Sequence, residues 1–378
     1  MVFPSPHHCS ARPARPAAAW PAAVTDSSGR SWLVGEPDPS AVFAVSDAQA
    51  SELVAAVFDL IGDHPDPEQI DHHELLIRAE VAIRRASPEL VAALVGFRVS
   101  GSCDGIMLLR GLPLDDPLPP TPLAGALPGS WRELTLSTAI QLMVMSVIGD
   151  VLCYADEKDG RLVQDICPVP GAENRQENTG SCLLELHTED GFHPNKPHFV
   201  SLLGLRSDHA RRALTLAAGI RTVLPRLDAR HVRVLWEPEF RIRLASSFVG
   251  SGPAAYSAPL PVLTGLPGDP DLCVDFHATE PLSAAAAAAL EALRQEMLGA
   301  LVGAVLEPGD LLVVDNRKAV HGRTGFSPRY DGEDRWLRRC FAVADIRAAH
   351  LVHPASRVHR ALSATGAGTG TGTGGPGR

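Results

Sequence analysis

The sequence predicts an α+β protein in which helices come first and the following strands form an antiparallel barrel or jelly roll. Before residue 155, apolar residues recur mainly at helical spacing. After residue 160, short apolar runs are separated by Gly, Pro and Asp turns, as expected of strands. One alanine-rich helix, predicted over residues 281–303, interrupts these runs. We therefore expect one domain with helical decoration and not two domains.

The N-terminal part contains four segments with the features of helices. Residues 46–62 begin with a Ser-x-x-Gln capping box and continue with helical apolar spacing. Residues 87–97, "SPELVAALVGF", have Ser at the cap and Pro at the first helical position. Apolar spacing also predicts helices over residues 72–86 and 135–155. Between them, "GIMLLRGLPL" at residues 105–114 predicts a buried strand that ends at Gly and Pro.

The C-terminal part contains the runs that resemble strands. Each run is rich in apolar residues and is bounded by turn residues. The runs cover residues 198–207, 213–224, 240–249, 304–316 and 335–346. Their spacing is irregular and we find no internal repeat, which favours a jelly roll or barrel.

Composition sets the expected boundaries of the domain. Residues 1–40 are rich in Pro and Ala and are expected to form a disordered leader. Residues 351–378 are a Gly/Thr-rich tail that we expect to be flexible. A single domain should then cover residues 41–350, with a helical part over 41–155 and a strand-rich core over 156–350.

Charge and cysteine content argue against several classes of protein. The net charge of −10 gives no basic surplus to neutralise phosphates, so we expect no nucleic-acid partner. The seven cysteines are scattered without a CxxC pair, which fits a reducing cytoplasm and argues against a disulfide framework or a zinc ribbon. Residues 1–23 contain no continuous apolar run, so we expect neither a signal peptide nor a membrane span.

The stretch "LELHTEDGFHP", residues 184–194, places an imidazole and a carboxylate two residues apart in an apolar context. If the segment is a strand, His187 and Glu189 share a face. Such a pair can chelate a metal, but it can also be a buried ion pair. These two residues alone leave both interpretations open.

A third candidate ligand is His321, which follows the predicted strand "LLVVDN" within residues 307–326. A single histidine near a strand end is usually an ordinary polar residue. Together with His187 and Glu189, however, it gives two imidazoles and one carboxylate. Three such ligands on one side of a metal leave the opposite positions open, as expected of a non-haem Fe(II) oxygenase.

Two arginines lie in the last predicted strand, "DRWLRRCFAVADI". In a strand, Arg335, Leu337 and Arg339 share one face, and the two arginine positions are roughly 13 Å apart. Arginines that face a cavity can each bind a carboxylate through two hydrogen bonds. The segment alone is equally compatible with exposed arginines on an edge strand.

The motifs "LHTEDGFHP", "DNRKAVHGR" and "RYDGEDRWLRR" resemble those of the clavaminate-synthase-like Fe(II)/2-oxoglutarate oxygenases. Within this family they are most similar to hydroxylases of free amino acids, such as the arginine and asparagine β-hydroxylases. The resemblance covers roughly residues 135–345. It implies a double-stranded β-helix, or jelly-roll, core with flanking helices. It also implies Fe(II) as cofactor, with 2-oxoglutarate and dioxygen as cosubstrates.

The resemblance assigns residues to the iron and to 2-oxoglutarate. The implied iron ligands are His187, Glu189 and His321. Arg335, fourteen positions after His321, matches the arginine that binds the far carboxylate of 2-oxoglutarate. Thr215, in "RRALTLAAG", is the candidate for the threonine that assists it.

The resemblance also implies contacts to an amino acid substrate. Arg339 matches the arginine that holds the α-carboxylate, and Glu157 the residue that contacts the amine. Asn178 matches a further polar contact. In relatives that hydroxylate arginine, acidic residues near Asp269 and Asp271 bind the guanidinium, although "GDPD" also has the composition of a simple turn.

The leading hypothesis is therefore hydroxylation of a free L-amino acid, most naturally at C3 of arginine, lysine, asparagine or a similar basic or polar residue. Such an enzyme would serve secondary metabolism, for example antibiotic biosynthesis. The same iron site could instead support desaturation, oxidative cyclisation or C4 hydroxylation of an amino-acid-derived intermediate. A zinc hydrolase would not require Arg335 and Arg339 at their spacing. A non-catalytic jelly-roll binding protein would be expected to lack one of the three metal ligands.

Overall fold

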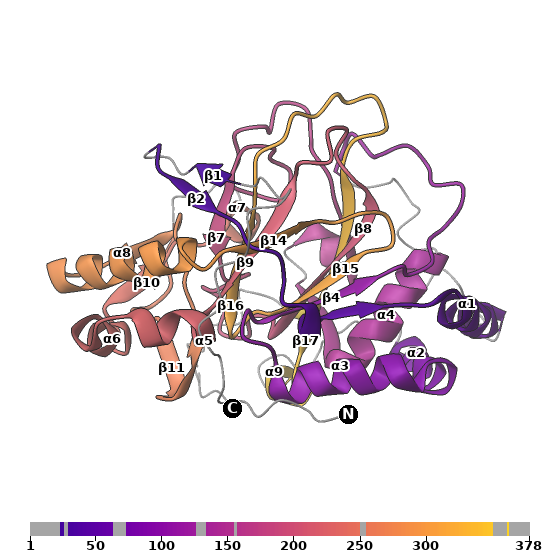
Figure 1. Cartoon of the computed structure of the whole chain (residues 1–378), viewed down its shortest axis with the longest axis horizontal. Helices are drawn as coiled ribbons and strands as arrows, with labels where there is room; N and C mark the ends of the chain where they lie inside the picture. Colours follow the sequence, from indigo (N-terminus) through magenta and orange to yellow (C-terminus); the bar gives the residue numbers. More distant parts are fainter. Residues whose placement is uncertain are drawn as a thin grey trace, which may run out of the picture.

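The computed structural model describes residues 23–25, 29–62, 73–125, 134–154, 157–249, 255–350 and 361–362. Two β-sheets lie at the centre of the molecule (Figure 1). One group of helices, α1 to α4, lies on the right of the sheets in this view, and another group, α5, α6 and α8, lies on the left. The α+β class predicted from the sequence is confirmed.

The larger sheet carries the N-terminal helices on its outer face. Its strands, in spatial order, are β18 (Ala361–Leu362), β5 (Asp150–Tyr154), β17 (Trp336–Val343), β8 (Phe199–Arg206), β15 (Leu311–Asp315), β4 (Ile106–Arg110) and β3 (Val42–Ala44), and β6 (Val163–Ile166) also pairs with β17. The helices are α1 (Asp47–Gly62), α2 (His73–Ala86), α3 (Pro88–Ser100) and α4 (Leu136–Ile148). Because nearly every residue of α4 is buried, this apolar helix forms the centre of the core between helices and sheet.

The smaller sheet is antiparallel and is covered by the second group of helices. Its order is β14 (Val302–Val305), β9 (Leu214–Gly219), β16 (Ala319–Arg323) and β7 (Leu184–His187). The covering helices are α5 (Ile220–Val223), α6 (Ala229–Leu235) and α8 (Ala284–Leu298). Buried residues of α8, among them Leu293 and Met297, belong to the same apolar cluster as Leu216 of β9.

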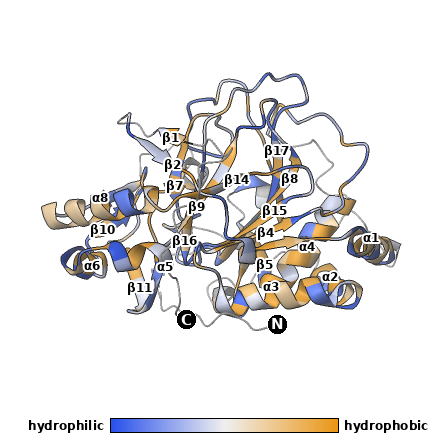
Figure 2. Cartoon of the chain, in the orientation of Figure 1, coloured by the Kyte–Doolittle hydropathy of each residue, from blue (hydrophilic) through white to orange (hydrophobic). Residues whose placement is uncertain are grey.

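The two sheets pack against each other through their inner faces. A third apolar cluster contains Leu202 and Leu337 from the larger sheet together with Ala217 and Ala304 from the smaller sheet. Central strands and α4 are the most hydrophobic parts of the chain, whereas the loops carry most of the hydrophilic residues (Figure 2). Strands at this interface carry the candidate site residues His187, Thr215, His321 and Arg339.

Short elements connect and flank the two sheets. They are β1 (Ala23–Thr25), β2 (Ser31–Leu33), η1 (Pro39–Ala41), η3 (Lys158–Gly160), η4 (Leu224–Arg226), β10 (Phe240–Ile242), α7 (Ser246–Val249), β11 (Leu263–Leu266), β12 (Asp269–Leu272), β13 (Thr279–Pro281) and α9 (Ile346–His350). Several of them differ from the sequence prediction. The runs predicted as strands over residues 213–224 and 240–249 each continue into a short helix.

The expected domain boundaries need correction at the N-terminus. Val24 and Val34 are buried in the apolar cluster beneath α8, although both lie in the segment predicted to be a disordered leader. Burial of these two side chains stabilises the β1–β2 hairpin on the domain. Residues 1–22 and most of the predicted tail, 351–360 and 363–378, lie outside the described residues.

The predicted helix over residues 135–155 is in fact a helix followed by a strand. The capping hydroxyl of Thr135 accepts from the backbone of Thr138, and α4 ends before Gly149. A Cβ on Gly149 would lie 2.5 Å from the carbonyl oxygen of Val343, so only glycine permits β5 to approach β17 here. By contrast, the predicted capping box of α1 is confirmed, since Ser46 and Gln49 exchange hydrogen bonds.

Two expectations about the chain as a whole can be compared with the described residues. Among them, no helix combines the length and the apolar character needed to cross a membrane. Cys153, Cys167, Cys182, Cys273 and Cys340 form no disulfide bond, as the scattered cysteines led us to expect.

Candidate functional site

A β-bulge at the end of β7 turns His187 into the space between the sheets. His187 is paired with His321 of β16, but Leu184, three residues earlier, is paired with Arg323, only two residues further along β16. Leu184 and His187 consequently line the same cavity. Glu185 points away from it and reaches Arg294 of α8 at 3.4 Å. Bulges of this kind are common where a strand must re-aim a functional side chain.

Glu189 lies in a turn after the strand, which differs from the predicted strand-borne pair. β7 ends at His187, and Asp190 has a φ of 47°. The fully buried amide of Asn316 holds the turn in place. Its Oδ1 accepts from the backbone N–H of Glu189 at 2.8 Å, and its Nδ2 donates to the carbonyl of Glu189 at 3.0 Å and to that of Pro197 at 2.8 Å.

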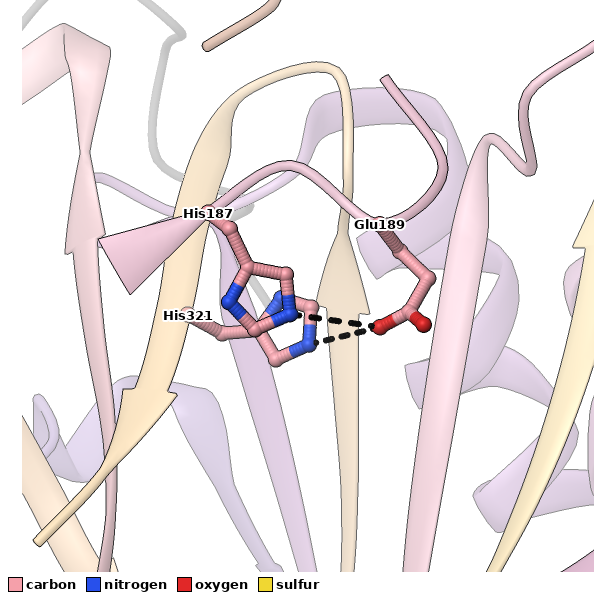
Figure 3. A group of neighbouring side chains, drawn as sticks. All are labelled: His187, Glu189 and His321. Carbon is pink, nitrogen blue, oxygen red and sulfur yellow. Dashed lines mark hydrogen bonds and ion pairs between the residues drawn. The ribbon is translucent and has the colours of Figure 1, made fainter. Parts of the chain in front are cut away.

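His187, Glu189 and His321 converge on one point in the cavity (Figure 3). The Glu189 Oε2 atom lies 3.6 Å from Nε2 of His187 and 3.1 Å from Nε2 of His321. Two ligands bound at right angles about 2.1 Å from a metal would be about 3 Å apart. The Nδ1 atom of His187 lies 2.9 Å from the carbonyl of Glu185, which orients its Nε2 toward the cluster. The donor set therefore fits a divalent metal ion.

Burial and neighbouring charges shift the pKa values of the three groups. Burial raises the pKa of Glu189, but Arg339 and the hydrogen bonds from both histidines hold it well below its usual range. Burial lowers the pKa of His187, but Glu189 outweighs this effect and the net pKa is raised. The pKa of His321 is lowered by burial and by His187. The cluster thus presents an ionised carboxylate and, without metal, retains a proton more readily on His187 than on His321.

Arg339 is fully buried beside the cluster and is bound by acidic side chains. Its Nη1 donates to Oε1 of Glu189, its Nη2 to Oε1 of Glu157, and its Nε to Oε1 of Gln164 at 3.0 Å. Burial opposes the charge, but Glu157 and Glu189 raise the pKa of Arg339 above its ordinary value. The guanidinium therefore links a candidate metal ligand to a second carboxylate.

Arg335 lies at another part of the cavity wall. Its Nη2 donates to Oγ1 of Thr215 at 3.2 Å. Burial, reinforced by Arg323, lowers the pKa of Arg335 to about 9. Arg335, Leu337 and Arg339 all line the cavity, so the predicted sharing of one face is confirmed.

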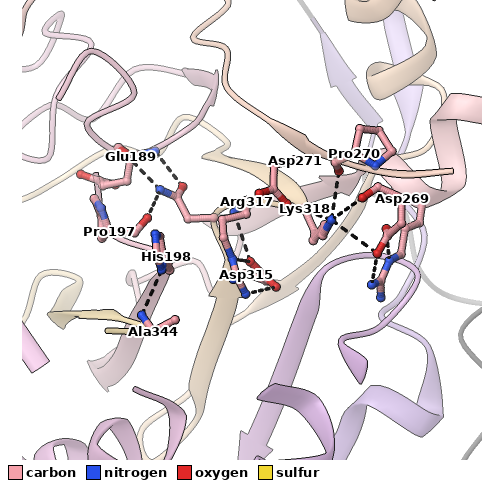
Figure 4. A network of polar contacts seen from close by, with 12 residues as sticks. Glu189, Pro197, His198, Asp269, Pro270, Asp271, Asp315, Arg317, Lys318 and Ala344 are labelled. Carbon is pink, nitrogen blue, oxygen red and sulfur yellow. Dashed lines mark hydrogen bonds and ion pairs between the residues drawn. The ribbon is translucent and has the colours of Figure 1, made fainter. Parts of the chain in front are cut away.

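The remaining predicted substrate residues divide into two groups. Asn178 lines the cavity with the histidines, and Glu157 is bonded to Arg339. Asp269 and Asp271 lie on β12 and are not among the cavity-lining residues. Both are already paired with cations, as Figure 4 shows around Lys318: Asp269 Oδ1 lies 2.8 Å from Nε of Arg221, and Asp271 Oδ1 lies 2.9 Å from the ammonium of Lys318.

Three residues of the site were not found by sequence reasoning. Asn316 follows β15 in the motif "DNRK", where an Asn after a strand was the available sequence feature. Gln164 has no motif around it, because its role follows only from the pairing of β6 with β17. Arg323 lies two residues after His321 and therefore shares its face of β16.

Comparison with known proteins identifies the family to which this arrangement of residues belongs. Residues 153–341 match the family model described as taurine catabolism dioxygenase TauD, TfdA family. The chain belongs to the TauD/TfdA family of dioxygenases. The matched segment contains His187, Glu189, His321, Arg335 and Arg339, so the resemblance inferred from the motifs is confirmed.

Individual relatives of this TauD/TfdA-family chain are named oxygenases and synthases. L-asparagine oxygenase from Streptomyces coelicolor is 48% identical over 263 residues, which are 69% of this chain and 78% of that protein. Clavaminate synthase 2 from Streptomyces clavuligerus is 36% identical and covers 78% of this chain and 90% of that protein. A structure of asparagine oxygenase with Fe(II), (2S,3S)-3-hydroxyasparagine and succinate has a TM-score of 0.79 and 42% identity, covering 85% of this chain and 99% of that chain.

The amide of Asn316 should be required for tight metal binding. Asn316→Ala removes the bonds that fix the turn carrying Glu189, so we expect the affinity for Mn(II) or Fe(II) to fall roughly 10–100-fold. Anaerobic calorimetric titration measures this affinity. Gln141→Leu is the control, since it removes a buried amide that bonds Ser201 and the carbonyl of Arg338 and not the turn that carries Glu189. Wild-type affinity in a folded Asn316→Ala protein would contradict the role.

Metal affinity should also rise with pH through the raised pKa of His187. Below that pKa the metal must displace a proton from the imidazole, whereas Glu189 stays ionised because its pKa is held low. Titrations across roughly pH 5–8 in buffers of different ionisation enthalpy measure both the affinity and the protons released. A flat profile without proton release would refute this assignment of protons.

Proposed function

We propose that this chain is an Fe(II)/2-oxoglutarate-dependent hydroxylase of a free L-amino acid, with C3 of L-asparagine as the first candidate position. The observation that carries the proposal is one cavity lined by His187, Glu189 and His321 and also by Arg335 and Arg339. Neither a hydrolase nor a simple binding protein requires buried arginines beside such a cluster. Membership of the TauD/TfdA dioxygenase family supports the same conclusion.

His187, Glu189 and His321 are the residues that would hold the iron. Their ligand atoms lie within 4.8 Å of one another, and the cluster is open to the cavity on its other side. With iron bound, oxidative decarboxylation of 2-oxoglutarate by dioxygen supplies succinate, carbon dioxide and the oxidant for a substrate C–H bond. The protein's contribution is to fix the ligands and to exclude water and other hydrogen donors.

Arg335 and Thr215 would bind the far carboxylate of 2-oxoglutarate. The guanidinium is fully buried, donates to the Thr215 hydroxyl and forms no ion pair within the described residues. A buried cation without a carboxylate partner is costly, and a bound dianion removes that cost. The site is thus prepared for an anionic ligand before that ligand arrives.

Arg339 and Glu157 would bind the two charges of the amino acid. At present the guanidinium is bonded to Glu157 and Glu189. With a metal ion neutralising Glu189, an entering zwitterion can exchange these contacts without leaving a charge unpaired, because its α-carboxylate takes the guanidinium and its ammonium takes Glu157. This exchange keeps the buried charges balanced and places the substrate beside the metal ligands.

The charges around the cavity favour an uncharged polar side chain on the substrate. Asp269 and Asp271, the residues expected to bind a basic side chain, are neutralised by Arg221 and Lys318 outside the cavity. Asn178 lines the cavity and offers an amide instead. The 48% identity to an L-asparagine oxygenase supports L-asparagine as the first substrate to test.

We also propose that the two facing sheets form a double-stranded β-helix core within one catalytic domain, supported by the apolar cluster that both sheets share. A place in secondary metabolism, such as antibiotic biosynthesis, is supported by the similarity to clavaminate synthase 2. The cytoplasmic location stays a prediction.

The test is a screen for succinate formation with Fe(II), ascorbate, 2-oxoglutarate and oxygen. Each of the common amino acids, together with ornithine and citrulline, is added separately. We expect L-asparagine or another uncharged polar amino acid to stimulate turnover most strongly, with a product heavier by one oxygen atom. Stimulation by none of them would refute the free-amino-acid proposal.

A further inference from the structure

Arg323 is a second buried cation in the same cavity as Arg335. It follows His321 by two residues on β16, and its side chain lines the cavity. Only 4% of the residue is exposed. Its Nη2 donates to the carbonyl oxygen of Cys182 at 2.8 Å, but its buried Nε has no hydrogen-bond partner. Within the described residues no carboxylate pairs with this guanidinium.

The sheet register brings Arg323 to the group that surrounds Arg335. On the neighbouring strand β9, Arg323 is directly opposite Thr215, whose hydroxyl accepts from Arg335. The ring of Phe326 lies close to both cations, since the guanidinium carbons of Arg323 and Arg335 are 5.0 Å and 5.9 Å from its centre. Two like charges so close together in a buried space repel each other unless an anion lies between them or beside them.

The distance between Arg323 and the metal cluster suits the dianion of a five-carbon diacid. Two residues along a strand correspond to roughly 6.5–7 Å, so Arg323 is displaced from His321 by about the length of a five-carbon diacid. A 2-oxo acid that chelates a metal at His321 would extend its distal carboxylate to this end of the cavity. Arg323 then offers its unused N–H, and the carboxylate compensates both cations.

We propose that Arg323 is a second binding residue for the distal carboxylate of 2-oxoglutarate, acting together with Arg335 and Thr215. This inference rests on the proposed function, since it requires 2-oxoglutarate to bind at the metal cluster. It predicts that specificity for a five-carbon diacid depends on two guanidinium groups, one on β16 and one immediately before β17.

Anaerobic calorimetry on the Mn(II)-loaded chain tests the proposal without relying on turnover. We expect Arg323→Gln to raise the Kd for 2-oxoglutarate roughly 10–100-fold, the effect of losing one hydrogen bond to a charged partner. Arg323→Lys should recover part of the affinity. Binding of 2-oxobutanoate, which keeps the 2-oxo acid but lacks the distal carboxylate, should be unchanged in both variants.

Arg241→Gln is the matched control, since it removes an arginine that pairs with Glu280 on β13, away from the cavity. Unfolding temperatures of all variants show whether a change in binding reflects a loss of fold. Wild-type affinity for 2-oxoglutarate in Arg323→Gln would overturn the inference and leave the proposed function intact. Equally weakened binding of 2-oxoglutarate and 2-oxobutanoate would also overturn the inference, because the substitution would then act at the metal. If the wild-type chain itself did not bind 2-oxoglutarate, both the inference and the proposed function would fail.

Discussion

His321→Ala is expected to abolish 2-oxoglutarate consumption with every amino acid. The substitution removes one of the three groups that converge in the cavity. This group is the imidazole closest to Glu189. Metal affinity should fall by more than the roughly 10–100-fold typical of lost outer contacts, because a ligand itself is lost. Succinate formation and Mn(II) titration, measured on the same preparation, check both effects.

The control for this experiment is His231→Ala on α6, a histidine outside the cluster. It should leave metal stoichiometry and turnover unchanged. Turnover by His321→Ala at a rate near that of the wild type would show that the metal assignment is wrong. Lost turnover with fully retained metal affinity would equally contradict His321 as a ligand.

Arg339→Met should have the second largest effect, on stability as well as on substrate binding. The variant leaves Glu157 and Glu189 buried without their cation, so we expect the free energy of unfolding of the metal-free protein to fall by about 3–5 kcal/mol. Bound metal should restore part of this loss, because it neutralises Glu189 and binds only the folded state. The KM for the amino acid should rise by a factor corresponding to roughly 2–3 kcal/mol.

Denaturant unfolding with and without Mn(II), combined with steady-state kinetics, measures these effects. Arg338→Met is the matched control, since Arg338 is also buried on β17 but bonds Ser137 of α4 and pairs with Asp165. Arg338→Met should lower the free energy of unfolding. It should change neither the KM for the amino acid nor the increase in unfolding free energy that Mn(II) produces. An unchanged KM in Arg339→Met would refute its role in binding the α-carboxylate.

The parts of the site that the sequence predicts are those governed by short spacing. His187 and Glu189 are neighbours, and strand periodicity alone places Arg335 and Arg339 on one face. His321 could be joined to them by donor type and by the motif resemblance but not by spacing, because pairing between β7 and β16 depends on long-range register. The fold class followed from the change of hydrophobic period along the chain.

The features that sequence reasoning missed depend on contacts between distant segments. A glycine is required after α4 because the carbonyl of Val343, nearly two hundred residues later, approaches Gly149 closely. The acidic pair on β12 looked available for a substrate until the structure placed Arg221 and Lys318 beside it. Local composition cannot reveal such charge compensation, since the cations come from other elements of the fold.

The most direct test of the central claim is the fate of isotopically labelled dioxygen. The purified chain is supplied with Fe(II), 2-oxoglutarate, L-asparagine and labelled dioxygen, and the products are analysed by mass spectrometry. We predict 3-hydroxyasparagine and succinate in equal amounts, with one labelled atom in the new hydroxyl group and the other in succinate. An amino acid that remains unchanged while 2-oxoglutarate is consumed, or a product whose new oxygen comes from water, would contradict the account.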